Sequence, residues 1–320
     1  MNIIPGILLC AVATLTSLPV EAAYPEKPVR IVVHFPPGGP TDLVARLIGQ
    51  KLGAAWGQPV VIDNIPGASG NIGADRVAKA APDGYTLLLA ASTLAVNVTL
   101  HERLPYDLVR DFVPVSRIAS SPFVLVVGND VPASNVKDLV SFAKAHPGAL
   151  TYASSGIGSA SHLSGELFNR MAGIETRHIP YKGTTSAVPD LMAGRVSMAF
   201  ATAAAILPFV REGKVRAIAA TSTRRISSAP DLPTISESGL PAFETGTWFG
   251  LLAPAHTPPA IVNKIYGDVV GVLSQPDVRH RLDELGMEVV GDTPQEFDRF
   301  MRADIAKWAQ VIKSVGLKRE

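Results

Sequence analysis

Apolar runs and helical periodicities alternate along residues 24–122. Residues 30–35 (RIVVHF) form an apolar, β-branched run typical of a buried strand, and residues 41–55 then carry leucine, isoleucine and valine at helical spacing. Further apolar runs at 60–62 and 85–92 are separated by a glycine turn and a helical segment. This alternation predicts an α/β fold, with a mostly parallel sheet and helices on both faces.

The same order of elements begins again in the second third of the chain. Strands are expected at 113–118 and 123–128, and residues 150–173 repeat the order of strand, Ser/Gly turn and helix. The chain ends in helical patterns, the last of which opens with Thr293 and Glu296 at capping-box spacing.

Two α/β units, with C-terminal helices expected to return to the first unit, predict two lobes with a ligand cleft between them. Each lobe is expected to hold a mostly parallel sheet flanked by helices. The expected lobe 1 comprises 24–122 and 246–320, and the expected lobe 2 comprises 123–245. Ligands of open α/β sheets bind outside the carboxyl ends of the strands, so the loops at those ends are the candidate site.

The composition is that of a folded globular chain rather than a disordered one. Of the 320 residues, 47% are hydrophobic and 18% are charged, and the mean hydropathy is +0.23. Lysine and arginine (29) nearly balance aspartate and glutamate (28), so the formal charge is +1. Without an excess of basic residues, we expect no nucleic-acid partner.

Residues 1–23 have the pattern of a secretory signal peptide. The apolar stretch Ile7–Ala13 is shorter than the about 18–20 residues of a spanning helix, and cleavage is expected near Ala22 or Ala23. An uncleaved N-terminal anchor remains the alternative, because Met1–Gly6 contains no lysine or arginine. We expect export to the periplasm and no stable membrane insertion of the mature chain.

The stretch VHFPPGGPTDLVARLIG, residues 33–49, places prolines and glycines between a strand and a helix start. Gly38 and Gly39 allow close approach to the backbone, and a helix N-terminus offers unpaired amides and partial positive charge to an anion. Thr41 is expected to cap the helix, with Asp42 in its first turn. The motif is neither a phosphate loop nor a dinucleotide fingerprint. A plain βα turn without a ligand remains the alternative.

A second turn, SSGIGS at 154–159, follows a strand and opens a helix through His162. If the lobes face each other, two helix starts are directed at one cleft from opposite sides, which suits a small carboxylate ligand. His34, at the cleft end of its strand, is interpreted as an interior or rim histidine. Lys182 is interpreted either as a solvated loop lysine or as a carboxylate partner.

Catalytic and metal chemistry have little support in this sequence. There is no G-x-S-x-G elbow, and Ser154 or Ser159 with His162 would place nucleophile and base on one turn without a third partner. The seven histidines show no metal-ligand spacing. Leucines precede Cys10, which argues against a lipoprotein, and cleavage of the signal peptide would remove this single cysteine. We therefore expect no enzyme, no metal site and no cofactor.

Eight sequence blocks occur in order across almost the whole chain after the expected signal peptide. They are FPPGGPTDLVAR, IPGASGNIGA, PDGYTLL, YASSGIGSASHLSGELF, IPYKG, DLMAGRVSMAF, GLLAPAHTP and TPQEFDRF with a following KW. In these blocks the chain resembles the substrate-binding receptors of tripartite tricarboxylate transporters, the Bug (TctC-like) family. The resemblance implies a type II-like, two-lobed periplasmic binding protein. It also implies delivery of an organic acid to a membrane permease with one large and one small subunit.

The resemblance further implies which residues hold a ligand carboxylate, largely through backbone amides and water. In lobe 1 these are Phe35, Pro37, Gly38, Gly39, Thr41 and Asp42, in lobe 2 they are Ser154, Ser155, Gly156 and Ser159, and on the cleft floor they are Ser92 and Thr93. The chain departs from the family pattern at His34, Ser69, Ser197, Ala201 and His256. Where the family often has an acid, Ala201 offers no partner to an amine, so amino-acid ligands are disfavoured.

The expected function is therefore that of a monomeric binding protein for a small carboxylate, whose identity the sequence leaves open. Two alternatives remain. The same fold could act as a ligand sensor for a membrane regulator, or a secreted hydrolase could use a two-lobed scaffold. The hydrolase is the less favoured, because an enzyme needs tuned acid–base pairs and this sequence offers backbone donors.

Overall fold

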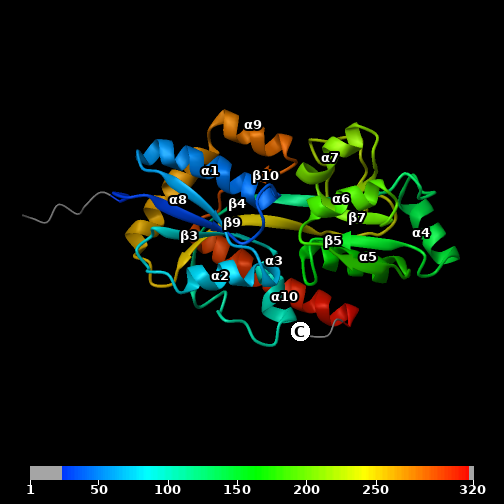
Figure 1. The fold of residues 1–320 in the computed structure, drawn as a ribbon, viewed down its shortest axis with the longest axis horizontal. Coiled ribbons are helices and arrows are strands. Elements are labelled where there is room, and N and C mark those ends of the chain that lie inside the picture. The colour runs from blue at the N-terminus through cyan, green and yellow to red at the C-terminus, as the bar shows by residue number, and fades with distance from the viewer. Residues whose placement is uncertain (1–23, 317–320) are drawn as a thin grey trace, which may run out of the picture.

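A computed structural model describes residues 24–316 of the chain (Figure 1). The predicted signal peptide, its cleavage position and Cys10 lie outside the described residues. The strands are β1 (Val29–Val33), β2 (Val60–Asn64), β3 (Thr86–Ala91), β4 (Phe112–Val127), β5 (Thr151–Ser154), β6 (Arg177–Pro180), β7 (Met198–Thr202), β8 (Arg216–Ala220), β9 (Gly246–Pro254) and β10 (Glu288–Val289). The helices are α1 (Pro40–Trp56), the 3₁₀ turn η1 (Ala68–Gly70), α2 (Asn71–Ala78), α3 (Thr93–Leu100), α4 (Val136–Ala145), α5 (Ala160–Ala172), α6 (Thr184–Met192), α7 (Ala203–Arg211), α8 (Pro259–Leu273), α9 (Pro276–Glu284) and α10 (Pro294–Val315).

Within residues 24–316 the strands form one ten-stranded sheet in the order β2-β1-β3-β9-β4-β7-β5-β6, with β8 and β10 also paired to β4. Strand β4 joins two groups of strands because it changes partners along its length. Its residues 112–122 pair with β9, and its residues 123–127 pair with β7 and β8. We call β2, β1, β3, β9, β10 and residues 112–122 of β4 the first part of the sheet. The second part is β5, β6, β7, β8 and residues 123–127 of β4.

The predicted α/β class is confirmed, but one mixed sheet takes the place of two separate, mostly parallel sheets. Strand β1 is parallel to β2 and β3, and β5 is parallel to β6 and β7, whereas every pairing of β4 and β9 is antiparallel. The separate strands predicted at 113–118 and 123–128 are one strand. A serine–proline sequence is locally a strand break, yet Ser121 and Pro122 continue the ladder opposite residues 246–247 of β9.

Helices cover both faces of the first part of the sheet. Along β1, Ile31 and Val33 face the core under α1, α8 and α9, whereas Val32 faces the core under α2, α3 and α10. All three side chains are fully buried. Figure 1 shows α1, α8 and α9 on one side of these strands and α2, α3 and α10 on the other. Because side chains on both faces of β1 are packed in the core, the end of this strand is held in place, and the loop that follows it starts from a defined position.

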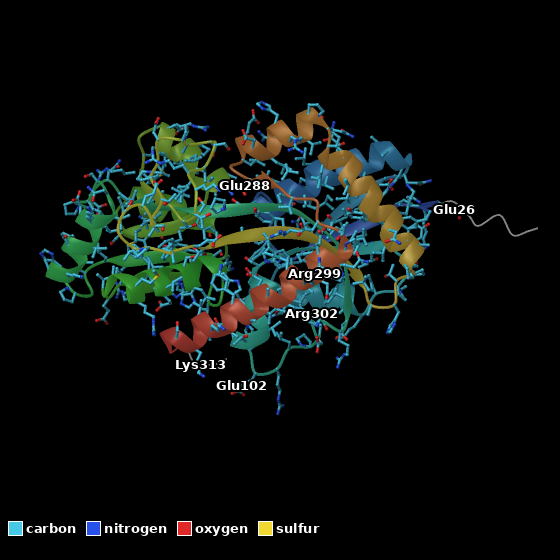
Figure 2. The ribbon with its side chains drawn as sticks, turned by 180° about the vertical axis from the view of Figure 1, so that it is seen from behind. Glu26, Glu102, Glu288, Arg299, Arg302 and Lys313 are labelled. Carbon is cyan, nitrogen blue, oxygen red and sulfur yellow. The ribbon has the colours of Figure 1, made fainter. Side chains whose placement is uncertain are left out.

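The C-terminal helix α10 spans the two parts of the sheet. It begins at the predicted capping box, in which Thr293 Oγ1 accepts the Glu296 amide (3.2 Å) and the Glu296 carboxylate accepts the Thr293 amide (2.9 Å). Its buried side packs against α3, α5 and β4. Its exposed side carries Arg299, Arg302 and Lys313 (Figure 2). Among the described residues, no helix combines the length and the apolar character that crossing a membrane requires.

Candidate functional site

A cavity of about 510 Å³ lies between the two parts of the sheet. From the first part and its loops it is lined by Phe35, Pro36, Pro37, Gly39, Pro40, Thr41, Ala91, Thr93, Thr247 and Phe249. From the second part it is lined by Phe123, Ser155, Ala160, Ser161, Lys182, Gly183, Ser186 and Thr202. The lining combines aromatic and proline side chains with hydroxyls, and the volume is typical of a site for a small organic molecule.

The cavity lies where parallel strands end and helices begin. In the first part β1 and β3 lead into α1 and α3, and in the second part β5, β6 and β7 lead into α5, α6 and α7. Ligands of open α/β sheets collect at this edge. The first amides of each helix have no acceptor within the helix and add partial positive charge, so the edge favours anionic ligands.

The loop before α1 is shaped by two glycines and a proline. Gly38 has a left-handed backbone (φ +82°), and α1 begins at Pro40 with Gly39 as its N-cap. The prediction that Thr41 caps this helix is wrong, because a proline at the first helical position is already in helical conformation and starts the helix earlier. Thr41 lies in the first turn instead. The residue is 4% exposed, and its hydroxyl has no partner among the described residues.

Asp42 stabilises this loop through hydrogen bonds to its carboxylate. Its carboxylate accepts hydrogen bonds from the Gly38 amide (2.9 Å), from Arg46 Nε (2.8 Å) and from Asn64 Nδ2 (3.0 Å). Burial raises the pKa of the Asp42 carboxyl, but these hydrogen bonds outweigh burial and hold its pKa below the usual range. Asn64 also donates to the Phe35 carbonyl (3.1 Å). The Asp42 carboxylate is therefore paired with other residues of the protein rather than with a ligand.

Several backbone amides of the Ser/Gly loop after β5 form hydrogen bonds within the protein. Three of them donate to side chains of the same segment: Ser155 to Ser161 Oγ (3.0 Å), Gly156 to Ser154 Oγ (3.1 Å) and Gly158 to His162 Nδ1 (3.1 Å). Ser159 is the N-cap of α5, so the predicted helix start is confirmed. The amides of Ala160 and Ser161, the first two of α5, have no acceptor among the described residues, and both residues line the cavity. The donors offered to a ligand here come from the helix start.

A cluster of three rings, two buried (Tyr152 and His162) and one half-buried (His178), packs beside the Ser/Gly loop. The rings of His162 and His178 stack with centroids 3.9 Å apart, and Tyr152 stacks on His178 at 4.9 Å. Burial lowers the pKa of His162 to about 3 and that of His178 to about 4, so both rings are neutral near pH 7. Ser154 Oγ lies 2.6 Å from His178 Nε2, and His162 Nδ1 already accepts a loop amide. The pairing of Ser154 or Ser159 with His162 as nucleophile and base is therefore not formed.

The ring of His34 is fully buried, and its Nε2 accepts the amide of Ala91 (3.1 Å). Burial lowers the pKa of His34 to about 3, so this ring too is neutral. Its interpretation as an interior histidine is confirmed, and its role is to join the ends of β1 and β3. Within residues 24–316 no three or more His, Cys, Asp or Glu side chains are grouped so that they could hold a metal ion.

The structure brings half of the predicted ligand residues to the cavity. Those that line it are Phe35, Pro37, Gly39, Thr41, Thr93 and Ser155. Those that lie outside the lining and support its loops are Gly38, Asp42, Ser92, Ser154, Gly156 and Ser159. Ser92 is an example, because its hydroxyl donates to Thr247 Oγ1 (2.8 Å), which belongs to the lining.

Sequence reasoning missed much of the lining. The residues it did not name are Pro36, Pro40, Ala91, Phe123, Ala160, Ser161, Gly183, Ser186, Thr202, Thr247 and Phe249. Ser161, Ser186 and Thr202 stand at helix starts after strands, so a systematic search for that signal would have found them. Phe123 and Phe249 carry no local signal, because pairings between distant strands bring them to the cavity.

Known proteins share this sequence and this architecture. The sequence profile described as "Tripartite tricarboxylate transporter family receptor" (TctC) matches residues 44–317. A structure of an R. palustris protein with adipate has 39% sequence identity and a TM-score of 0.90, covering 93% of this chain and 100% of that one. The periplasmic binding protein BugD has 35% identity and a TM-score of 0.87, covering 93% and 100%. MatC from Rhodopseudomonas palustris with bound malate has 36% identity and a TM-score of 0.84, covering 90% and 100%. These likenesses confirm the predicted α/β fold of periplasmic binding proteins.

Proposed function

The chain belongs to the TctC (Bug) family of tripartite tricarboxylate transporter receptors, and from this premise we propose that it is a periplasmic receptor for a small organic acid. The family resemblance in the sequence is thereby confirmed. The family is one of binding proteins, so the expectation that the chain is not an enzyme is confirmed by its membership rather than by any missing residue.

One observation carries the proposal: donors without partners converge on the cavity from both parts of the sheet. The first part supplies the hydroxyls of Thr41 and Thr93, residues that are 4% and 5% exposed, and the second supplies the amides of Ala160 and Ser161. None of the described residues that line the cavity is an acid. A cavity that offers donors and contains no anion of its own is complementary to a carboxylate.

The ligands of two similar structures support the same class. One was solved with adipate and the other with malate, and both of these molecules are dicarboxylates. Each structure covers 90% or more of this chain. We take from them the general class, a small carboxylate, since the two ligands differ in the groups between their carboxylates.

The receptor is proposed to have two lobes, 24–122 with 246–320 and 123–245, that close on the ligand. Strand β4 exchanges β9 for β7 and β8 between Pro122 and Phe123, and β9 begins at Gly246, so both crossovers coincide with these boundaries. Flexing there would change the width of the cavity, and a bound ligand would shift the population toward the closed form.

Transport is the role that this proposal assigns to ligand binding. The closed receptor would present its ligand to a membrane permease with one large and one small subunit, a partner inferred from the family alone. Export of the mature chain to the periplasm fits this role, since the receptor must meet the acid before the permease does. Transport is preferred over sensing because the matched family is one of transporter receptors.

A thermal-shift panel on the chain from Tyr24 onward tests the proposal. The protein is first freed of co-purified ligand, and the panel contains mono-, di-, tri- and aromatic carboxylates with their neutral amides as controls. A ligand at about 100 times its Kd stabilises the folded state by about 2.7 kcal/mol, a shift of several degrees in Tm. Stabilisation by acids and not by their amides is expected, and a flat panel would overturn the proposal.

A further inference from the structure

A second cavity, of about 730 Å³, lies beside the two crossovers between the parts of the sheet. Its lining includes residues 120–122 of β4 and residues 244–248, where the chain enters β9. These are the segments at which the two proposed lobes are joined. None of the predicted ligand residues lines this cavity. The second cavity therefore borders the joint between the lobes rather than the proposed carboxylate site.

The second cavity and the proposed ligand cavity lie on opposite faces of β4 and β9. Thr247 and Phe249 of β9 line the ligand cavity, whereas Trp248 between them lines the second cavity, because side chains alternate between the two faces of a strand. Thr247 borders both cavities. Across the sheet Trp248 pairs with Ser120, which pairs with Glu288, and all three residues line the second cavity. Figure 2 shows β4 and β9 from this side, running between Glu288 and α10.

One wall of the second cavity is α10, which is attached to the first part of the sheet. Trp248 Nε1 donates a hydrogen bond to Asp304 Oδ2 (2.7 Å), and Arg117 Cζ lies 3.7 Å from the centroid of the Phe300 ring. Asp304 and Phe300 line the cavity from α10. Another wall comes from residues 222–224, which follow β8 in the second part. The second cavity therefore has a wall from each of the two proposed lobes.

Loops of the two proposed lobes are in contact beside the ligand cavity in this structure. The Ser69 hydroxyl, in the first lobe, donates to the Ile157 carbonyl of the second lobe (3.2 Å). Bending at the crossovers that separated these loops would turn the lobes about β4 and β9. Because the second cavity lies on the opposite face of these strands, the same bending would bring its walls together. The closed form therefore leaves the second cavity wide, and the open form would narrow it.

We propose that the second cavity sets the balance between the open and closed forms of the receptor, and that a group which fills it favours the closed form. Such a group holds apart the walls that opening would bring together. A larger closed fraction of the ligand-free receptor lowers the observed Kd of a ligand that binds the closed form, although the group never touches that ligand. The inference rests on the proposed function, because it requires two lobes that close on a ligand.

Ala303 allows the second cavity to be filled by chemical modification. It is exposed on α10 and belongs to the lining. The chain from Tyr24 onward contains no cysteine, so Ala303→Cys introduces a unique thiol. Methylthiolation of this thiol adds little bulk, whereas reaction with a pyrenyl maleimide adds a large group, and the two products form a matched pair. Ala306→Cys, at an exposed position of α10 outside the lining, is modified in the same two ways as the control.

Calorimetric titration with adipate compares the four products. At position 303 the pyrenyl product is expected to bind adipate at least about threefold more tightly than the methylthiolated product, whereas the two products at position 306 should agree within about twofold. Thr223→Trp, which adds bulk from the wall at residues 222–224, should also tighten adipate binding.

Small-angle X-ray scattering without ligand gives a second readout. The radius of gyration of the pyrenyl product at position 303 should be smaller than that of its methylthiolated partner, because a larger fraction of the chain is closed. The pair at position 306 corrects for the scattering of the pyrenyl group itself.

Equal or weaker adipate binding by the pyrenyl product at position 303, or an unchanged radius of gyration, would overturn the proposal. A gain of affinity that also occurs at position 306 would overturn it too, since the effect would then come from the label and not from the cavity. If the wild-type chain binds neither adipate nor any other acid of the thermal-shift panel, the proposed function fails. The scattering of the ligand-free products still decides, in that case, whether filling the second cavity closes the lobes.

Discussion

The hydroxyl of Ser69 donates a hydrogen bond to the carbonyl oxygen of Ile157, 3.2 Å away, and so connects the loop after β2 to the Ser/Gly loop after β5. Ser69 has a left-handed backbone (φ +54°, ψ 30°), an unfavourable conformation for a residue with a Cβ atom. The buried side chain of Asn97 stabilises this conformation by donating from Nδ2 to the Ser69 carbonyl (3.1 Å). A loop of the first part of the sheet and a loop of the second part are therefore in direct contact beside the cavity.

We predict that Ser69→Ala weakens ligand binding by about threefold, because a hydrogen bond of this kind contributes about 0.5–1.5 kcal/mol and here connects the loop after β2 to the Ser/Gly loop, of which Ser155 lines the cavity. Calorimetric titration with the acid that binds the wild-type chain most tightly measures the change in Kd. Ser141→Ala, at an exposed position of α4, is the control. An unchanged Kd in Ser69→Ala would show that this contact does not favour the ligand-bound form.

Gly158 provides a second contact between the parts. A Cβ atom at Gly158 would lie 2.1 Å from Leu100 Cδ2, whereas one at Gly148 would meet nothing within 4 Å, and both glycines have left-handed backbones (φ +71° and +74°). Gly148→Ala should therefore show only the backbone penalty, about 1 kcal/mol. Gly158→Ala should lose a further 1–3 kcal/mol or so from overpacking against Leu100. Urea denaturation measures both, and equal losses would contradict the close packing of this loop on α3.

Stability should fall as the pH falls below about 6.5, the pKa of an unperturbed histidine. His34 and His162 stay neutral in the folded protein down to about pH 3, and His178 stays neutral down to about pH 4. Between those values and pH 6.5 the unfolded chain binds more protons, so the free energy of unfolding decreases with decreasing pH and this contribution levels off below about pH 3.

The variant His162→Asn removes the contribution of His162 alone, because asparagine keeps an acceptor for the Gly158 amide and cannot be protonated in this range. Urea denaturation at several pH values between about 6.5 and 4 should give a shallower pH dependence for the variant than for the wild-type chain. The same slope in both proteins would show that His162 is not the buried neutral group described above.

Local signals in the sequence are enough to predict the helix starts around the cavity. Helical periodicity after the proline–glycine turn places α1, Ser159 caps α5, and the capping box at Thr293 places the start of α10. The aromatic part of the cavity cannot be predicted in this way. Phe123 reaches it through the pairing of β4 with β7, and Phe249 through the pairing of β9 with β3. Such pairings between distant segments leave no local pattern.

Asp42 illustrates a second limit of sequence reasoning. An acid beside a glycine-rich turn can face either a ligand or the protein, and which of these holds depends on the partners that tertiary structure supplies. Here the partners are Arg46, one helical turn further along, and Asn64 at the end of β2. The same applies to Gly156, whose amide is bound by Ser154 within its own loop. Spacing in the sequence identifies the loop, but it does not show which of the loop's hydrogen-bond donors remain available to a ligand.

The most direct test of the carboxylate site is a calorimetric titration of the double variant Thr41→Val/Thr93→Val with the acid that binds the wild-type chain most tightly. Valine has the shape of threonine without its hydroxyl, and neither hydroxyl has a described partner within the protein, so the double variant should remain folded. Because hydrogen bonds to a charged group contribute about 1.5–3 kcal/mol each, we predict that the Kd rises by at least about tenfold. An unchanged Kd in the folded double variant would contradict the assignment of this cavity as the carboxylate site.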